Sequence, residues 1–228
     1  MKTRCQQCEL KQKCSEVLNI THNYSTPYNH GSDNWLTKRT HLILKASDLA
    51  PITLKYSPFK SREQLLYETA RHYKANIDNE AVRHGTKYEP EAIENYKLLT
   101  GHDLIPTLNL CINPNFFEGK FGCTPDGITY CGILLETKCP YSRNVKPGSP
   151  IPNYYEGQVF SSMNALGLTK GHFFEWDVSK RISNLVEVTE QDSIKWLNTH
   201  KESLNDFVNE VKVLRGFFSN LESLPLVT

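Results

Sequence analysis

Two acidic residues and one lysine in a short segment have the types and spacing needed for metal-assisted hydrolysis: Asp126, Glu136 and Lys138. Glu136 and Lys138 are two positions apart on a predicted strand, so both side chains leave the same face. Residues 133–135 are apolar, and a Glu and a Lys that end such a strand are costly to bury without partners. A tight turn at Cys131-Gly132 places Asp126 across a hairpin from Glu136.

Two neighbouring carboxylates repel each other, and a divalent cation relieves that repulsion. Hard oxygen ligands of this kind suit Mg²⁺ or Mn²⁺, which bind a few carboxylates together with substrate phosphate. Phosphodiester cleavage then requires an activated water and charge stabilisation, and Lys138 can orient or deprotonate that water or add positive charge. The alternative is a surface ion pair on an edge strand, with Asp126 in an ordinary Pro-Asp-Gly turn.

The elements that must position these residues follow from periodicity. Helices are predicted at about 61–76, at 87–100 after an N-cap at Thr86, at 154–166 and from 190 to about 221. Strands are predicted at 108–112, 116–123, 126–130, 133–138, 172–178 and 185–188. This order predicts an α/β or α+β fold, with a central mixed sheet flanked by helices.

The bulk properties are those of a globular protein. The chain has 228 residues and a net charge of +1, so composition alone does not indicate a nucleic-acid binder. Seven cysteines and the absence of a signal peptide or a membrane segment predict an intracellular protein, in the cytoplasm or a host nucleus, that is not secreted. Residues 1–34 are predicted to form a cysteine-rich appendage, and residues 35–228 the main domain.

Two motifs of the chain are similar to those of a known family. Thr124-Pro-Asp-Gly127 and Glu136-Thr-Lys-Cys-Pro140 resemble the Ser-Pro-Asp-Gly turn and the Glu-x-Lys-Cys-Pro strand end of the lambda exonuclease and YqaJ viral recombinase family. That family belongs to the PD-(D/E)XK nucleases, so the resemblance implies a core like that of restriction endonucleases. It also implies that Asp126, Glu136 and the backbone carbonyl of Thr137 hold metal.

Two helical segments extend this resemblance. Gly85-Thr-Lys-Tyr-Glu89 resembles the family's Gly-x-x-x-Glu, whose Glu contributes to the metal site, although Glu89 also fits a capping box with Thr86. Tyr154-Tyr-Glu-Gly-Gln158 resembles the start of Tyr-x-x-Gln-x-Gln, and Phe160 stands where the second Gln is usual. Gln158 is either a contact near the active centre or an incidental residue of an amphipathic helix.

The resemblance also implies a phosphate anchor. Trp35-Leu-Thr-Lys-Arg39 and Lys45-Ala-Ser47 resemble the family's Trp-x-x-x-Arg and Thr-Ala-Ser, whose Arg and Ser hold the 5′-terminal phosphate of DNA. A guanidinium suits bidentate phosphate binding. With Thr124 added, Arg39 and Ser47 form the predicted anchor, and a solvated Lys-Arg pair beside a helix cap is the alternative.

The activity implied by the resemblance is 5′→3′ digestion of linear double-stranded DNA with two Mg²⁺ ions. Single-stranded tails for recombination or viral genome processing would result, with a single-strand annealing protein as a partner and a homotrimer as one assembly. The alternatives are an endonuclease, a single-strand or RNA nuclease with the same site, and an inactive DNA-binding adaptor.

The N-terminal cysteines leave a second metal open. Cys5, Cys8 and Cys14 have metal-like spacing, and His22 or His30 could complete a zinc site. Disorder is the alternative, because a segment with so few apolar residues needs a metal to order it.

Overall fold

A computed structural model describes residues 6–28, 31–73, 78–106 and 109–222 of the chain. Its centre is a four-stranded sheet in the order β3 (Gly127–Ile128), β4 (Ile133–Lys138), β5 (Lys170–Asp177) and β6 (Ile182–Thr189). The β4–β5 pair is parallel, whereas the β3–β4 and β5–β6 pairs are antiparallel. The predicted mixed sheet of an α+β fold is therefore confirmed.

Helices cover both faces of this sheet. Leu135 and Phe174 pack with Ala92 and Tyr96 of α6 (Glu80–Thr100). The residues just before them on the strands, Leu134 and Phe173, face the other side and pack with α7 (Asn153–Leu166). Because side chains alternate along a strand, Glu136 and Lys138 share the α7 side with Leu134.

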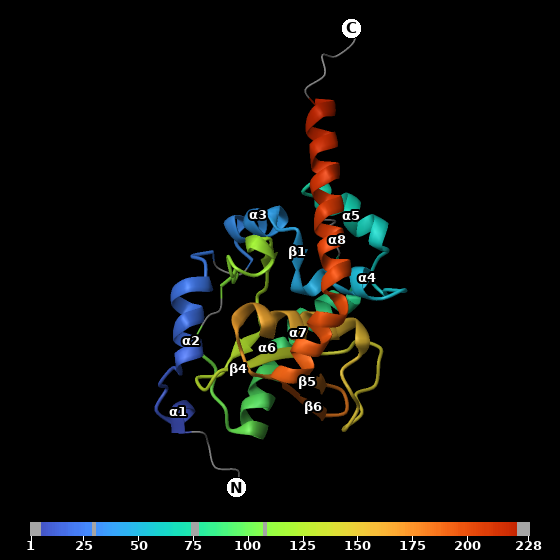
Figure 1. Ribbon diagram of the computed structural model, residues 1–228. Helices are drawn as coiled ribbons and strands as arrows, with labels where there is room; N and C mark the ends of the chain where they lie inside the picture. The colour runs from blue at the N-terminus through green and yellow to red at the C-terminus, as the bar shows by residue number, and fades with distance from the viewer. Residues whose placement is uncertain (1–5, 29–30, 74–77, 107–108, 223–228) are drawn as a thin grey trace.

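The last helix, α8 (Glu190–Glu222), packs against α7, α4 (Ala50–Thr53) and α5 (Arg62–Ala70), then extends past the body of the molecule (Figure 1). The Arg62 guanidinium clamps it to α5 by donating to both carboxylate oxygens of Glu210, at 2.7 and 2.8 Å. No described helix is both long enough and apolar enough to cross a membrane.

The N-terminal segment folds onto the same core. It contains α1 (Gln6–Glu9), α2 (Ser15–Asn19) and the π-helical turn η1 (Ile20–Tyr24). The buried side chains of Cys8, Cys14, Val17 and Ile20 belong to the large cluster that also holds Leu134 and Val159. The buried residues of this described segment therefore pack in the main core rather than in a separate one.

The next elements along the chain are α3 (Asp33–His41), β1 (Leu44–Lys45) and the 3-10 turn η2 (Ala46–Asp48). β1 pairs in parallel with β2 (Phe121–Gly122), which follows a second 3-10 turn, η3 (Phe117–Gly119). Two predictions are wrong here. The segment predicted as a strand at 116–123 contains only the two-residue β2, and residues 109–112 form only two isolated bridges at Cys111, to Ser25 and to Cys123. Residues 107–108 lie outside the described part.

Two helix boundaries also differ from the predictions. The helix predicted from residue 87 begins at Glu80, because the Asn79 side chain accepts a hydrogen bond from the Val82 amide at 2.9 Å. The helix predicted at 61–76 ends at Ala70, and residues 74–77 lie outside the described part.

Candidate active site

The β3–β4 hairpin brings the two central carboxylates together. Gly127 pairs with Leu135, so the preceding Asp126 falls opposite Glu136, as the sequence predicts. Gly132 supplies the turn with a φ of 84°, a left-handed conformation that glycine adopts without strain. The Oδ2 atom of Asp126 accepts hydrogen bonds from the Thr137 amide at 2.6 Å and the Thr137 hydroxyl at 2.8 Å, which fix its orientation.

Glu136 and Lys138 form a close ion pair at the end of β4. Lys138 Nζ lies 2.5 Å from Glu136 Oε1, and the Glu136 side chain is 2% exposed. Burial, followed by repulsion from Asp126, raises the pKa of Glu136 to about 8. Burial opposes the charge of Lys138, but attraction to Glu136 and then Asp126 outweighs it, and the Lys138 pKa is raised.

Glu89 belongs to the same electrostatic group. Because α6 already begins at Glu80, Glu89 is a mid-helix residue and the capping-box alternative is wrong. Its side chain remains exposed, yet partial burial and then repulsion from Asp126 raise its pKa to about 7. The charge of Asp126 acts on Glu89 and the charge of Glu89 acts on Glu136, so α6 adds a third carboxylate to this electrostatic group.

One cavity of about 160 Å³ collects most of the predicted residues. α7 contributes Gln158, whose backbone carbonyl accepts a hydrogen bond from the Ser162 hydroxyl at 2.7 Å. The side chains that line the cavity and could contact a substrate come from separate segments of the chain: Trp35, Arg39, Lys45, Ser47, Thr124, Asp126, Glu136, Lys138, Gln158 and Ser162.

The predicted phosphate anchor forms one side of this cavity. Arg39 Nη2 donates to Ser47 Oγ at 2.7 Å, and the Arg39 guanidinium lies 5.3 Å from the centre of the Trp35 ring. The Trp35 indole nitrogen donates to Thr124 Oγ1 at 3.3 Å. Arg39, Ser47 and Thr124 are therefore brought together by a chain of contacts, as the sequence analysis predicts.

Lys45 is a lining residue that the sequence analysis did not assign to the site. Its side chain is 11% exposed and its ammonium lies 3.5 Å from Asp48. Burial lowers its pKa, and the charge of Asp48 opposes that effect. The available signal was its position two residues before Ser47, where it replaces the usual Thr of the motif with a cation.

Comparison with known proteins shows which family this chain belongs to. Residues 34–169 match the YqaJ-like viral recombinase domain, a span that includes every lining residue named above. The chain belongs to the YqaJ-like viral recombinase family. A search of curated protein sequences finds no match.

Solved structures show the same fold for this YqaJ-family chain. The alkaline exonuclease LHK-Exo from Laribacter hongkongensis is similar with a TM-score of 0.66 and 23% identity, over 83% of this chain and 100% of that one. LHK-Exo in complex with dAMP gives a TM-score of 0.67 with the same identity and coverage. A phage-related exonuclease from Haemophilus somnus 129PT gives 0.56 at 13% identity, over 80% and 99% of the two chains.

The carboxylates of the YqaJ site fit a hard divalent cation. Glu136, Asp126 and Glu89 carry oxygen atoms that could serve as ligands, and a cation would offset the burial and the repulsion from Asp126 that raise the pKa of both glutamates. The oxygens of these three described carboxylates do not all lie within 4.8 Å of one another, and Glu136 pairs with Lys138. The role of the Thr137 carbonyl stays a prediction.

The predicted zinc ligands are not brought together. Cys5 and His30 lie outside the described residues. Of the other candidates, His22 is exposed and Cys14 lies against Gly132, while Cys8 contacts residues from elsewhere in the chain. The set proposed from local spacing is therefore wrong for Cys14 and His22, which do not belong to the group of close ligand atoms that contains Cys8.

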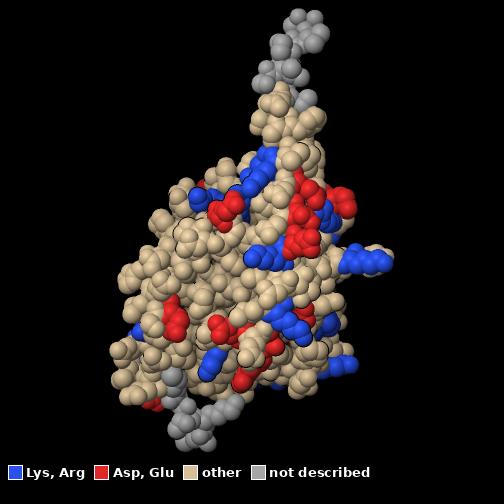
Figure 2. Space-filling view, in the orientation of Figure 1, with Lys and Arg blue, Asp and Glu red and all other residues tan. Residues whose placement is uncertain are grey.

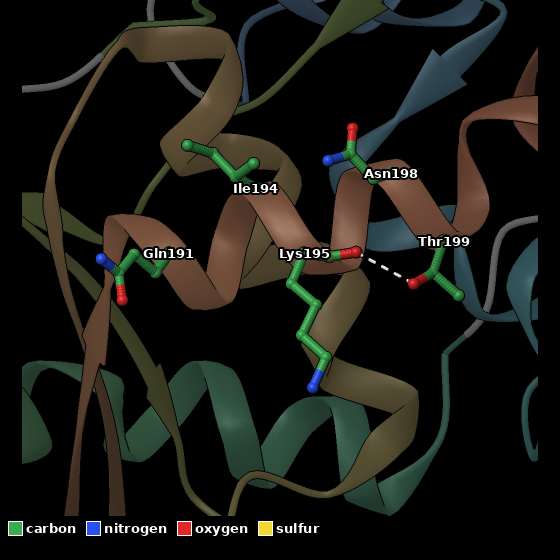
Figure 3. Close-up of a pocket in the computed structure, with 5 residues that line it drawn as sticks. All are labelled: Gln191, Ile194, Lys195, Asn198 and Thr199. Carbon is green, nitrogen blue, oxygen red and sulfur yellow. Dashed lines mark hydrogen bonds between the residues drawn. The ribbon is translucent and has the colours of Figure 1, made fainter.

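A larger but shallow hollow of about 510 Å³ lies elsewhere, along one face of α8 (Figure 3). It is lined only by residues of that helix, and Thr199 donates to the Lys195 carbonyl at 2.9 Å, a bond within the helix. None of the described residues that line it is a carboxylate, so it offers no catalytic chemistry of the kind at Asp126.

Proposed function

We propose that this chain is a metal-dependent DNA nuclease of the PD-(D/E)XK type, which digests linear double-stranded DNA 5′→3′ from phosphorylated ends. The observation that carries the proposal is one cavity in which Arg39 and Ser47 face the Asp126, Glu136 and Lys138 set. Residues that can bind a terminal phosphate and residues that can support hydrolysis line the same small cavity, which suits the end of a DNA strand. The family match and the exonuclease fold agree with this function.

The acidic residues and Lys138 have distinct roles in the proposed reaction. Asp126, Glu136 and Glu89 would hold one or two Mg²⁺ or Mn²⁺ ions. When bound, such an ion would polarise the phosphate and activate a water. Thr137 keeps Asp126 oriented through two hydrogen bonds. Lys138 presents ammonium N–H groups to the attacking water and to the charge that develops on phosphate. Gln158 supplies an uncharged hydrogen-bonding group beside them.

The side of the cavity that carries the predicted phosphate anchor is positively charged. Arg39 and Lys45 both line it, and Ser47 offers a hydroxyl. The net charge of the chain is only +1, and Lys, Arg, Asp and Glu side chains are intermingled on the face drawn in Figure 2. Local cations in the cavity, rather than a broad basic surface on that face, therefore account best for binding a DNA end.

Digestion of end-labelled DNA tests the exonuclease assignment. Linear duplexes with and without a 5′ phosphate, nicked circles, closed circles, single strands and RNA are compared with Mg²⁺ and with EDTA. Release of nucleotides from the 5′ end of linear duplex only with Mg²⁺ is the expected result. Rapid cutting of closed circles would instead indicate an endonuclease, and no cleavage of any substrate would indicate an inactive DNA-binding adaptor.

Arg39→Ala is expected to remove the preference for a 5′-phosphorylated end. The guanidinium offers the charged, bidentate contact to a terminal phosphate, worth about 1.5–3 kcal/mol or roughly 10- to 100-fold in affinity. The ratio of kcat/KM for phosphorylated and unphosphorylated duplexes measures the effect. Lys38→Ala, which removes an exposed cation next to Arg39 on α3, is the matched control and should keep the preference. An unchanged ratio in Arg39→Ala would refute the anchor.

Two features of assembly follow from the family resemblance rather than from the site. A homotrimer would close around the DNA, and light scattering of the purified chain measures its mass. The single-stranded tail that a 5′→3′ exonuclease leaves is the substrate of a single-strand annealing protein, so co-purification with such a partner tests the second prediction.

A further inference from the structure

Three side chains that are far apart in the sequence meet at the turn of the β3–β4 hairpin, at the opposite end of β4 from Glu136. They are Cys8 of α1, His102 just after α6, and Cys131 in the turn itself. Cys8 Sγ lies 3.6 Å from His102 Nδ1 and 3.9 Å from Cys131 Sγ, and Cys131 Sγ lies 3.8 Å from His102 Nδ1.

These separations match the spacing of ligands around a zinc ion. Zinc–sulfur bonds of about 2.3 Å and zinc–nitrogen bonds of about 2.0–2.1 Å at tetrahedral angles place two sulfurs about 3.8 Å apart, and a sulfur and a nitrogen about 3.6 Å apart. The three observed distances fall within a few tenths of an ångström of these values. A disulfide between Cys8 and Cys131 would instead need the sulfurs at about 2.0 Å.

The surroundings of the three ligands also suit a metal–thiolate site. Cys8 is fully buried, and His102 presents its Nδ1 atom, a common metal-binding atom of histidine, to both sulfurs. The Thr129 hydroxyl lies 3.2 Å from Cys131 Sγ and accepts a hydrogen bond from the Ile133 amide at 2.9 Å. Its own hydrogen can therefore point to the sulfur, as an outer hydrogen bond to a bound thiolate does.

We infer that Cys8, His102 and Cys131 form a structural zinc site that fastens the N-terminal segment and the end of α6 to the turn of the catalytic hairpin. Soft sulfur ligands with one imidazole favour Zn²⁺ over the hard Mg²⁺ of the nuclease site. Within the part of the chain that the structure describes, the ligand atoms of these three residues all lie within 4.8 Å of one another. They occupy three of the four positions of tetrahedral zinc.

Metal analysis of the purified full-length chain tests this inference without an activity assay. Elemental analysis after dialysis is expected to find about one zinc ion per chain. In a Co²⁺-substituted sample we expect the near-ultraviolet absorption of a thiolate–cobalt bond. Cys131→Ser and His102→Ala are expected to lose the zinc, whereas His102→Cys, which restores a ligand, is expected to retain it.

Cys14→Ser is the matched control, since Cys14 is also buried in the N-terminal segment but lies outside the trio. It should keep the zinc. Absence of zinc and of the cobalt–thiolate band from the wild-type chain would overturn the inference, and so would zinc retained in folded Cys131→Ser. A Cys8–Cys131 disulfide in the wild-type chain, detected by mass spectrometry without reductant, would overturn it as well. None of these readouts depends on the proposed nuclease activity.

Discussion

Asp126→Asn and Lys138→Ala are each expected to slow Mg²⁺-dependent digestion of linear duplex DNA by about 10²- to 10³-fold, the usual effect of removing one group that stabilises transition-state charge. The asparagine amide would keep the shape of the Asp126 side chain and could still accept the Thr137 hydrogen bonds, but it would lack the negative charge needed to hold a divalent cation. Removing Lys138 takes the ammonium away from Glu136 and from the cavity.

The measurement is single-turnover release of labelled nucleotide at saturating Mg²⁺, with circular dichroism to verify that each variant is folded. Asp177→Asn and Lys97→Ala are the matched controls. Asp177 is the last residue of β5 and does not line the cavity, and Lys97 pairs with Glu94 on the surface of α6. Both controls should digest DNA at the wild-type rate. Wild-type rates in folded Asp126→Asn would contradict the proposed metal chemistry.

Arg143→Ala is expected to destabilise the protein by about 3 kcal/mol, because it leaves the buried Glu175 carboxylate without its cation. Glu175 has no exposed surface and forms an ion pair with Arg143. Asn184 Nδ2 donates to the other carboxylate oxygen at 3.1 Å but carries no charge. Urea unfolding followed by circular dichroism gives the free energy of unfolding.

Two variants separate the buried charge from other effects of Arg143. Lys180→Ala removes the cation of a neighbouring pair with Asp177, 3.7 Å apart and 48% exposed at the lysine, and should cost less than about 1 kcal/mol. The double variant Arg143→Ala, Glu175→Gln should be more stable than Arg143→Ala alone, because the uncompensated charge is gone. Equal costs for Arg143→Ala and Lys180→Ala would contradict the argument.

Local sequence predicted those elements whose signals are themselves local. β4 has the predicted bounds, Ile133–Lys138, because its apolar run ends at two charged residues that face the cavity. α7 ends where Gly167 adopts a φ of 68°. The start of α6 was missed because its first turns are exposed and carry no apolar stripe. The sequence of residues 109–112 is typical of a strand, but its buried residues, Leu110 and Cys111, pack in the core without extended pairing.

Residues of the candidate sites were also predictable only where their arrangement depends on local sequence. Asp126, Glu136 and Lys138 could be predicted because one hairpin contains them, and hairpin pairing is fixed by sequence spacing. The Cys8, His102 and Cys131 group could not, since those residues come from three segments with no common local pattern. The cysteine spacing near the N-terminus predicted Cys14 and His22 as partners of Cys8, whereas tertiary packing places His102 and Cys131 next to it.

The short parallel pairing of β1 with β2 has a consequence for the length of the DNA products. Leu44 is in register with Phe121, and Lys45 with Gly122. Ser47 lies two residues beyond the first strand and Asp126 four residues beyond the second, so backbone hydrogen bonds set their separation. In the proposed nuclease this pairing would fix the distance between the bound 5′ phosphate and the phosphodiester bond to be cut. Each catalytic event should therefore release a fragment of one constant length.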